Sequence, residues 1–358
     1  MLEQFKEQIL NARTNKTPLQ IRGGGTKDWY GETPQGTLLD TRNHSGIIAY
    51  EPTELVITAR CGTPLAEIEA ALAERNQWLA FEPPHFGASA TFGGMVASGI
   101  SGPSRQAVGA VRDFVLGATL MDGKGDVLHF GGQVMKNVAG YDVSRLLVVS
   151  LGTLGLLLDI SIKVLPRPVA ISSRRFAMTE AEAIRSLNTW GGQPLPISAS
   201  CWHDGILTLR LSGAQAAVDA AEKKLGGDVI AHADAFWHSL REQTHRFFDE
   251  KCNTQKALWR LSVPSVIAPL RLSGCSLLEW CGAQRWLIAE LEDAEKIRAE
   301  ISAIGGHATL YRGGRQGGET GVGVFQSLAP AVAKIHRNLK NAFDPANIFN
   351  RGRMYPEH

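Results

Sequence analysis

The sequence has no cysteine cluster. Its 358 residues include five scattered cysteines and no Cys-x-x-Cys pair. Iron–sulfur clusters and structural zinc ions usually take their ligands from closely spaced cysteines. We therefore expect no metal centre in this chain. An odd number of scattered thiols also fits a protein that is kept reduced in the cytosol. The cysteines are Cys61, Cys201, Cys252, Cys275 and Cys281.

The sequence also lacks a strong charge imbalance and a long apolar run. Its formal net charge of +2 gives no indication of a nucleic-acid surface. The longest mostly apolar run, residues 146–162, is interrupted by Ser150, Gly152 and Asp159. It falls short of the ~20 apolar residues that span a bilayer. The N-terminal residues are acidic and lack the basic start of a signal peptide. We expect a soluble protein of about two domains that reaches a membrane only through partners.

Neither of the two common nucleotide-binding motifs is present. No Gly-x-x-x-x-Gly-Lys-Ser/Thr string occurs, and no helix pattern follows Gly23-Gly-Gly25 as a Gly-x-Gly-x-x-Gly fingerprint requires. The chain has instead two other glycine-rich segments, Arg22–Lys27 and Thr91–Gly102. Glycine lets the backbone approach a bulky anion, and successive free amides form a concave site for phosphate oxygens. Each segment alone could be a surface turn, but two in one domain suggest the diphosphate of a dinucleotide.

Further segments place these motifs in a known order. Residues 109–117 read Gly-Ala-Val-Arg-Asp-Phe-Val-Leu-Gly. A hairpin is predicted to turn at Asp122-Gly123. Residues 152–166 are mostly apolar and begin with Gly152 and Gly155. With residues 136–146 and the two glycine-rich segments, they resemble the FAD-binding domain of the vanillyl-alcohol-oxidase, or PCMH-type, flavoprotein family. The resemblance covers about the first 168 residues, and residues 339–354 resemble the closing segment of the same family.

The resemblance implies an α+β fold in three parts. We expect a PCMH-type FAD-binding domain of two α/β subdomains at 1–168 and an α+β cap domain at 169–312. A connector and C-terminal segment at 313–358 would pack back on the FAD domain.

Local patterns predict several elements. Residues 78–81 are predicted to form a strand. In the cap, a hairpin is predicted to turn at Asp204-Gly205, helices are predicted at 214–225 and 236–251, and a β-α-β set at 287–312. These patterns favour an antiparallel sheet backed by helices.

The glycine-rich segments and the resemblance together imply a set of cofactor-binding residues. For Arg112 and Asp113 the alternative is a surface ion pair, and for Gly152 and Gly155 it is a β-bulge. The expected FAD-binding residues are Arg22, Gly23, Gly24, Gly25, Thr26, Lys27, Pro84, Thr91, Gly93, Gly94, Ala97, Ser98, Ser101, Gly102, Arg112, Asp113, Gly152, Gly155 and Leu156. A structural role around the flavin is expected for Lys136, Asn137 and Tyr141.

We expect FAD to be held without a covalent bond. Family members that attach FAD covalently carry a His or Cys at a loop position, whereas the first glycine-rich segment here has Thr26 and no histidine. His85, just ahead of the second segment, is the alternative attachment point.

The sequence lacks the histidine motifs of the catalytic relatives in this family. Related D-2-hydroxyacid dehydrogenases carry a His-Gly-x-Gly-Asp-Gly-Asn-type string and a Glu-His-Gly string, and neither occurs here. No base for a substrate hydroxyl proton is therefore evident. Asn350-Arg351-Gly352 also stands where the family usually has Asn-Pro-Gly. Arg312 and Arg315 could hold a substrate carboxylate, although the glycine-rich stretch around them could simply be a connector.

Within the family, the chain is most similar to the small FAD-binding subunits of bacterial glycolate oxidases. This similarity implies oxidation of glycolate, a small 2-hydroxy acid, to glyoxylate. The implied partners are a larger homologous FAD subunit and an iron–sulfur subunit, on the cytoplasmic face of the inner membrane. Two alternatives remain open: a self-sufficient FAD-dependent 2-hydroxyacid dehydrogenase, and a non-catalytic scaffold. The missing histidines argue against the first alternative, and the retained glycines argue against the second.

Overall fold

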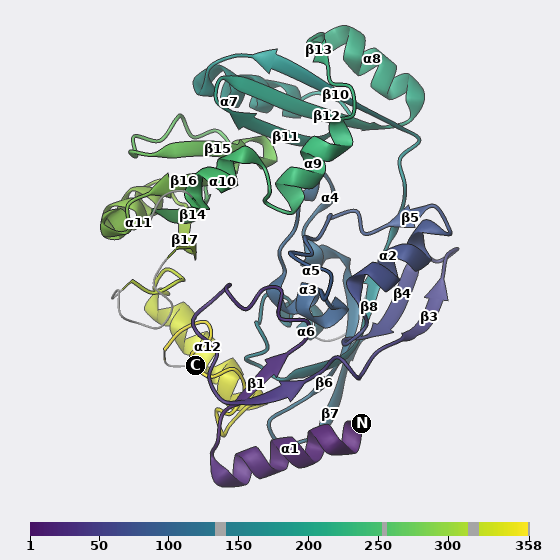
Figure 1. Cartoon of the computed structure of the whole chain (residues 1–358), viewed down its shortest axis with the longest axis vertical. Helices are drawn as coiled ribbons and strands as arrows, with labels where there is room; N and C mark the ends of the chain where they lie inside the picture. The colour runs from purple at the N-terminus through teal and green to yellow at the C-terminus, as the bar shows by residue number, and fades with distance from the viewer. Residues whose placement is uncertain (133–140, 253–255, 314–321, 357–358) are drawn as a thin grey trace.

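Two antiparallel sheets and a C-terminal helix organise the chain (Figure 1). The computed structural model describes residues 1–132, 141–252, 256–313 and 322–356. Within these ranges, the smaller sheet has the strand order β3-β4-β8-β6-β7 and the larger has the order β13-β10-β12-β11-β15-β16-β14-β17. Lys136, Asn137 and Arg315 lie outside the described residues. No helix in the described ranges combines the length and apolar character needed to cross a bilayer.

The smaller sheet carries the N-terminal part of the chain. Its strands are β3 (Ile47–Glu51), β4 (Val56–Arg60), β6 (Val115–Met121), β7 (Val127–Gly131) and β8 (Leu156–Lys163). Two short pairs accompany it, the parallel β1 (Leu19–Arg22) and β2 (Thr37–Asp40) and the antiparallel β5 (Gln77–Trp78) and β9 (Leu165–Pro166). The helices are α1 (Leu2–Asn15), α2 (Leu65–Ala73), α3 (Phe92–Ser98), α4 (Arg105–Val108), α5 (Val111–Phe114) and α6 (Val143–Leu146).

Strand β8 is apolar on both faces because a helical layer covers each one. Leu156 and Leu158 pack with Phe5 of α1, whereas Ile160 and other β8 side chains pack with α2 and α3. Burial on both faces favours apolar residues, and Asp159 and Ser161 are the only polar residues at 156–162. The end of β8 nearest Gly155 thereby lies close to α3.

The larger sheet holds the middle of the chain. Its strands are β10 (Ala170–Ala177), β11 (Ile197–His203), β12 (Ile206–Gly213), β13 (Asp228–Val229), β14 (Ala257–Ser262), β15 (Cys275–Glu279), β16 (Gln284–Ala289) and β17 (His307–Arg312). Its helices are α7 (Glu180–Gly191), α8 (Gln215–Leu225), α9 (Ala233–Arg241), α10 (Arg246–Cys252) and α11 (Ala294–Ala303), with 3-10 turns η1 (Trp280–Gly282) and η2 (Leu291–Asp293). Alternate residues of β12 point to opposite faces: Leu209 packs under α7 and α8, and Arg210 reaches Glu82 in the N-terminal part.

The structure confirms some of the predicted elements and corrects others. The hairpin that turns at Asp204-Gly205 and the β-α-β set of β16, α11 and β17 are both present. The single helix predicted at 236–251 is wrong, because the chain breaks between α9 and α10. There Gln243 has a positive φ of 54°, and the carboxylate of Glu242 accepts hydrogen bonds from the backbone of another segment. The strand predicted at 78–81 is also wrong, since only Gln77–Trp78 pair with β9.

The C-terminal segment returns to the N-terminal part of the chain. Helix α12 (Pro330–Phe343) precedes it, and Phe349 forms a parallel bridge with Leu19 of β1. The amide of Leu19 donates to the carbonyl of Ile348 at 2.7 Å, and the amide of Asn350 donates to the carbonyl of Leu19 at 2.9 Å. Residues 348–350 therefore extend the β1 edge and end beside the first glycine-rich segment.

Candidate functional site

The two glycine-rich segments converge on a pair of adjoining cavities. One cavity has a volume of about 100 Å³ and lies among residues 22–28, α3 and the C-terminal segment. The other, of about 70 Å³, continues from it toward the start of β8. Both cavities are lined by Ile21, Gly23, Gly94, Ala97, Leu151 and Asn350. Segments that are far apart in the sequence thus build one continuous site.

Fourteen of the nineteen predicted residues line these cavities. They are Arg22, Gly23, Gly24, Gly25, Thr26, Lys27, Thr91, Gly93, Gly94, Ala97, Ser98, Gly152, Gly155 and Leu156. The predicted residues that line neither cavity are Pro84, Ser101, Gly102, Arg112 and Asp113. Tyr141, expected near the flavin, also lines neither cavity, and its side chain is 96% exposed.

The first glycine-rich segment forms a nest of free amides. The backbone N–H groups of residues 23–27 donate no hydrogen bond to any residue in the described ranges. Gly25 has φ of 73°, a conformation that glycine adopts without strain. The Arg22 guanidinium pairs with Asp28 at 2.6 Å across the segment and fixes its curvature. Consecutive free amides in such a turn form an anion-binding concavity.

The second glycine-rich segment is a helix rather than a loop. Thr91 caps α3 by accepting a hydrogen bond from the Gly94 amide at 3.2 Å. The Phe92 and Gly93 amides donate to the carbonyls of Thr63 and Cys61, each at 2.8 Å. Since the amides at the start of α3 already have partners, this segment does not form a second nest of free donors.

The glycines of α3 allow close packing and leave space in the cavity. A Cβ on Gly93 would overlap Cys61, so Gly93 lets α3 approach the residue that follows β4. A Cβ on Gly94 would meet only the Thr91 hydroxyl, at 3.0 Å, and would otherwise point into the cavities that this residue lines. Gly94 is helical and does not have a positive φ, so the space beside it, and not its backbone conformation, is what favours glycine there.

The five predicted residues outside the cavities have other contacts. The amide of Gly102 donates to the Phe81 carbonyl at 2.9 Å, and its own carbonyl accepts a bond from the Trp280 indole at 3.0 Å. The Ser101 hydroxyl accepts a bond from the Val111 amide at 3.2 Å. Arg112 and Asp113 form a long, exposed pair at 4.0 Å, which is the alternative stated for them above. Pro84 is buried outside the cavities.

Two residues of the C-terminal segment line the site and were not predicted. Asn350 accepts a bond from the Ile21 amide at 2.8 Å and donates to the Leu151 carbonyl at 2.6 Å. The buried guanidinium of Arg353 donates to the Asp28 carbonyl at 2.8 Å and to the Glu32 carbonyl. The similarity of residues 339–354 to a family closing segment was the available signal for them. The other lining residues not predicted are Ile21, Asp28, Thr41, Cys61, Leu151 and Leu157.

Lys27 places a titratable positive charge at the edge of the first cavity. Its ammonium group lies 3.2 Å from the His85 carbonyl oxygen. Burial lowers the pKa of Lys27 to about 8, while the nearby carboxylate of Glu242 acts in the opposite direction. The His85 ring itself lies 3.1 Å from Glu69 and lines neither cavity.

An aromatic cluster lies beside Lys27 where β17 meets the N-terminal part. The rings of Trp29 and Tyr311 lie 5.0 Å apart, and the Arg312 guanidinium stacks over Trp29 at 4.1 Å from its centroid. Arg260 of β14 donates to the Tyr30 hydroxyl at 3.3 Å. Burial raises the pKa of Tyr311 to about 12, so its hydroxyl stays protonated at neutral pH. The aromatic cluster thus holds two arginines against its rings.

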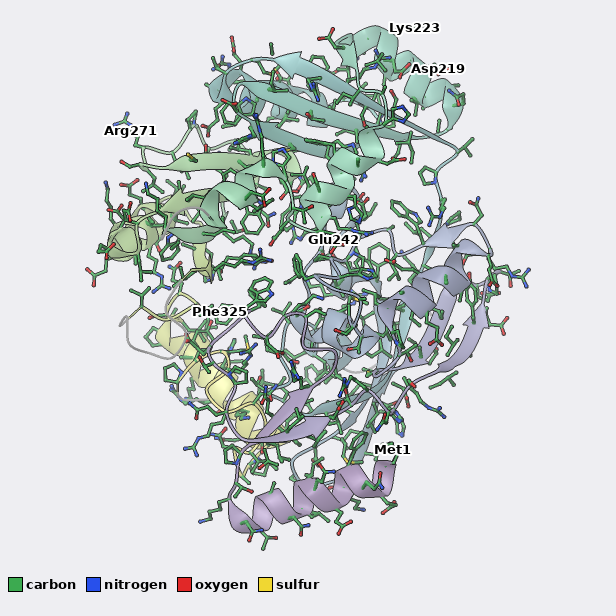
Figure 2. The ribbon with its side chains drawn as sticks, in the orientation of Figure 1. Met1, Asp219, Lys223, Glu242, Arg271 and Phe325 are labelled. Atoms are coloured by element: carbon green, nitrogen blue, oxygen red, sulfur yellow. The ribbon has the colours of Figure 1, made fainter. Side chains whose placement is uncertain are left out.

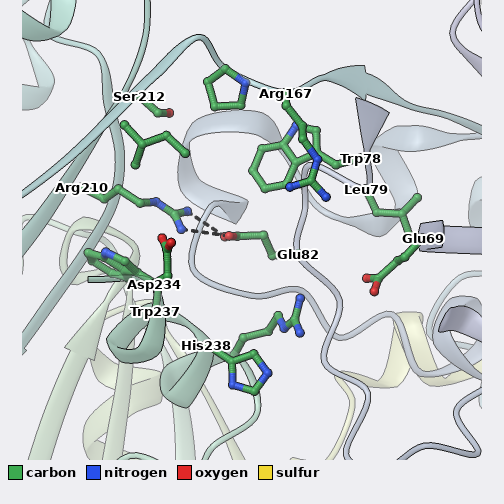
Figure 3. Close-up of a pocket in the computed structure, with 13 residues that line it drawn as sticks. Glu69, Trp78, Leu79, Glu82, Arg167, Arg210, Ser212, Asp234, Trp237 and His238 are labelled. Carbon is green, nitrogen blue, oxygen red and sulfur yellow. Dashed lines mark hydrogen bonds and ion pairs between the residues drawn. The ribbon is translucent and has the colours of Figure 1, made fainter. Parts of the chain in front are cut away.

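Carboxylates at the junction hold the chain that leads into the second glycine-rich segment. Figure 2 shows Glu242 between the larger sheet and the N-terminal part. It accepts hydrogen bonds from the amides of His85 and Phe86 at 3.1 and 2.9 Å. Glu82 pairs with Arg210 at 2.8 Å (Figure 3). Burial raises the pKa of Glu82. The charge of Arg210 and the hydrogen bonds with Arg210 and Ser104 outweigh this effect and hold the pKa below its ordinary value.

A third cavity is separate from the glycine-rich segments. It has a volume of about 360 Å³ and lies around the Glu82–Arg210 pair at the junction of the two sheets (Figure 3). Its walls carry charges of both signs, with Arg167 and Asp234 among them. None of the predicted cofactor-binding residues lines it, although it is larger than the two cavities that they do line.

Comparison with known proteins agrees with this geometry. The family profile described as an FAD binding domain matches residues 2–131. The chain is 48% identical to glycolate oxidase subunit GlcE of Escherichia coli, over 98% of this chain and 96% of that protein. It is 30% identical to glycolate oxidase subunit GlcD of Bacillus subtilis, over 95% of this chain and 84% of that protein. A solved structure of alkyldihydroxyacetonephosphate synthase shares the fold, with a TM-score of 0.66 at 15% identity over 96% of this chain and 74% of that one.

Proposed function

Because the chain belongs to the glycolate oxidase subunit GlcE family of FAD-dependent oxidoreductases, we propose that it is the FAD-binding subunit of a glycolate oxidase complex. The complex would oxidise glycolate to glyoxylate and pass the electrons to an iron–sulfur subunit, beside a larger homologous FAD subunit. When bound, FAD supplies an acceptor for two electrons that can be released singly. The observation that carries the proposal is the convergence of the 22–27 nest, α3 and the C-terminal segment on one site.

The residues present fit an FAD diphosphate. Free amides at 23–27 and the Lys27 ammonium supply donors and positive charge. The space left by the absent side chain of Gly94 gives a bulky group room against α3. We assign cofactor contact to the fourteen predicted residues that line the cavities, with Asn350 and Arg353 added. Ser101 and Gly102 would then position α3 rather than touch the cofactor.

We propose that the FAD is held noncovalently. The His85 ring pairs with Glu69 and lines neither cavity, and no histidine of the described residues lines either one. The Cys61 thiol lines the second cavity, but burial raises its pKa well above the usual value, which leaves it a poor nucleophile. Acid precipitation of the purified chain should release a yellow supernatant. A flavin that stays with the pellet would show covalent attachment instead.

The aromatic cluster is the proposed place for a small 2-hydroxy acid. Arginine binds carboxylates with two parallel hydrogen bonds, and its planar guanidinium stacks on aromatic rings. Arg312 and Arg260 both contact the cluster from the larger sheet. The six residues that define the cluster are Trp29, Tyr30, Phe86, Arg260, Tyr311 and Arg312.

None of the six residues that define the aromatic cluster is a base suited to removing a hydroxyl proton at neutral pH. Tyr311, with a pKa of about 12, is protonated there, and the cluster's arginines are cationic. General-base catalysis works best with a group whose pKa lies near the operating pH. This favours a subunit that depends on its partners over a self-sufficient dehydrogenase.

Two measurements separate the three candidate functions. The visible spectrum of the purified chain decides whether it is a flavoprotein or a scaffold without FAD. Dye-coupled glycolate oxidation by the FAD-loaded chain, alone and co-expressed with both partner subunits, then distinguishes a dependent subunit from a self-sufficient enzyme. We also propose that the protein is cytoplasmic and reaches the inner membrane only through its partners, so membrane fractions should lose it when the partner genes are deleted.

A further inference from the structure

A narrow apolar groove lies between the 146–154 segment and α12. Its volume is about 270 Å³, and its walls are mostly apolar. We call it the α12 groove, and its apolar lining residues are Leu146, Val148, Val149, Leu154, Leu339 and Met354.

The α12 groove and the cofactor cavities share a wall. Val149 and Ser150 line the groove, while the next residue, Leu151, lines both cavities. On the other side, Asn350 lines the cavities and Met354 lines the groove. A molecule seated in the groove would therefore be separated from the proposed FAD site by a single layer of protein.

The shared wall has an unusual and firmly held backbone. Val149 and Leu151 have positive φ values of 68° and 49°, which are rare for branched or bulky side chains. The amide of Val149 donates to the carbonyl of Val96 at 3.3 Å, and the amide of Leu151 donates to the carbonyl of Ala97 at 3.0 Å. These two hydrogen bonds to carbonyls of α3 hold residues 149–151 against the helix, which keeps the wall thin and fixed. They also turn Val149 toward the groove, where its side chain stays 37% exposed.

The apolar surface continues from the groove along α12. Val332 and Ile335 are 42% and 57% exposed and lie on the same helical face as Leu339, which lines the groove. Apolar side chains this exposed in one strip indicate an interaction surface. The neighbouring face of α12 carries Lys334 and Arg337, and the helix contains no acidic residue. A partner that fits this surface presents apolar side chains flanked by carboxylates.

We propose that the α12 groove is the docking site of the electron-accepting iron–sulfur subunit, through an apolar segment flanked by Asp and Glu. This inference rests on the proposed function. The described residues contain no group of His, Cys, Asp and Glu side chains able to hold a metal, and the proposed function passes the electrons to an iron–sulfur centre on a partner subunit. Each glycolate loses two electrons and two protons to become glyoxylate, and the docked iron–sulfur centre receives the electrons one at a time. The shared wall makes this groove the short path out.

The test uses one exposed residue on the proposed surface and one matched residue elsewhere. Ile335→Glu places a carboxylate in the apolar strip of α12. Ile48→Glu makes the same change at a 50% exposed position on β3, on a different side of the molecule from α12 (Figure 1). Each variant is tagged and co-expressed with the larger FAD subunit and the iron–sulfur subunit from the same organism. The readouts are the iron–sulfur subunit retained on the tag and the FAD content of the tagged chain.

We expect Ile335→Glu to lower retention of the iron–sulfur subunit about tenfold or more, as loss of an apolar interface anchor does. The FAD content of Ile335→Glu should stay at the wild-type level. Ile48→Glu should show wild-type retention of the iron–sulfur subunit and wild-type FAD content. Lys334→Glu should weaken retention and Lys334→Arg should not, because the proposed partner is acidic.

Three results would overturn the proposal. If Ile335→Glu retains the iron–sulfur subunit fully and has normal FAD content, the α12 groove is not the docking site, but the proposed function still holds. If the wild-type chain retains no iron–sulfur subunit, both the docking site and the proposed function are wrong. If Ile335→Glu instead abolishes binding to phosphatidylglycerol vesicles while subunit retention is unchanged, the strip is a membrane surface.

Discussion

The side-chain amide of Asn350 donates to the carbonyl of Leu151 at 2.6 Å, and both residues line the same two cavities from positions 199 residues apart. The Asn350 carbonyl oxygen accepts a bond from the Ile21 amide at 2.8 Å. One side chain thus joins β1, the wall of the α12 groove and the C-terminal segment. The proposed FAD site depends on this junction, because β1, the segment around Leu151 and the C-terminal segment all meet at Asn350.

Asn350→Ala should weaken both the fold and the cofactor site. The change leaves the Ile21 amide and the Leu151 carbonyl without partners, and a buried unsatisfied group costs about 1–3 kcal/mol. Urea unfolding should show a loss of that size, and FAD titration should show weaker binding. Asn338→Ala, on an exposed position of α12, is the control and should change neither. Unaltered FAD affinity in Asn350→Ala would exclude the C-terminal segment from the site.

Side chains added at Gly94 should close the cavity without unfolding the chain. Gly94 is helical and has open space toward both cavities, so Gly94→Ala should reduce FAD affinity and Gly94→Val should abolish binding. Thermal unfolding of the apoproteins should change little. Gly191→Val, at a position where an added Cβ meets nothing, is the matched control. Normal flavin occupancy in Gly94→Val would mean that the cofactor does not pass along α3.

FAD affinity should fall at alkaline pH through Lys27. Burial lowers the pKa of Lys27 to about 8, so the apoprotein carries the positive charge below that pH and loses it above. A diphosphate favours the charged form, so the dissociation constant of FAD should rise above about pH 8, by at most about tenfold per pH unit. Fluorescence titration of the apoprotein with FAD from pH 6 to 10 measures this dissociation constant.

Two variants separate the charge of Lys27 from its packing. Lys27→Arg keeps the charge at all these pH values and should bind FAD without the alkaline loss. Lys27→Met should bind weakly at every pH. An alkaline loss that persists unchanged in Lys27→Met would assign the titration to another group.

The pair of Lys340 and Asp344 should dominate the stability of the C-terminal return. The Lys340 ammonium lies 2.7 Å from the fully buried carboxylate of Asp344 and donates to the carbonyls of Thr153 and Phe349. Lys340→Met leaves that carboxylate without its cation, and breaking a buried pair in this way costs about 3–5 kcal/mol. The free energy of unfolding in urea should fall accordingly. Lys334→Met, exposed on the same helix, should have little effect.

A double variant checks this explanation. Lys340→Met combined with Asp344→Asn removes both charges, so much of the lost stability should return. If the double variant is less stable than Lys340→Met alone, the loss came from packing rather than from the buried charge.

The order of motifs in the sequence was enough to predict most of the residues that line the two candidate cavities. The 22–27 nest, α3 and the glycines of 152–155 meet as expected because glycine marks places where backbones approach closely. The helical form of residues 92–98 was missed. Its glycines suggested a loop, whereas the Thr91 cap and the carbonyls of Cys61 and Thr63 complete the first turn.

Contacts between distant segments could not be read from local patterns. Asn350 and Arg353 act through hydrogen bonds to backbone groups more than 300 residues away, and no periodicity records such bonds. The break between α9 and α10 was missed for the same reason. The amphipathic pattern runs on through residues 236–251, but Glu242 turns out of the helix to hold the amides of His85 and Phe86.

The most direct test of the proposed function is dye-coupled glycolate oxidation by the FAD-loaded chain, compared with the same chain co-expressed with both partner subunits. We predict that the isolated chain carries FAD and turns over glycolate poorly or not at all, because none of the six residues of the aromatic cluster beside Lys27 is a suitable base. The co-expressed assembly should be active, and omitting this chain should abolish that activity. Turnover by the isolated chain equal to that of the assembly would contradict the subunit assignment and identify a self-sufficient dehydrogenase.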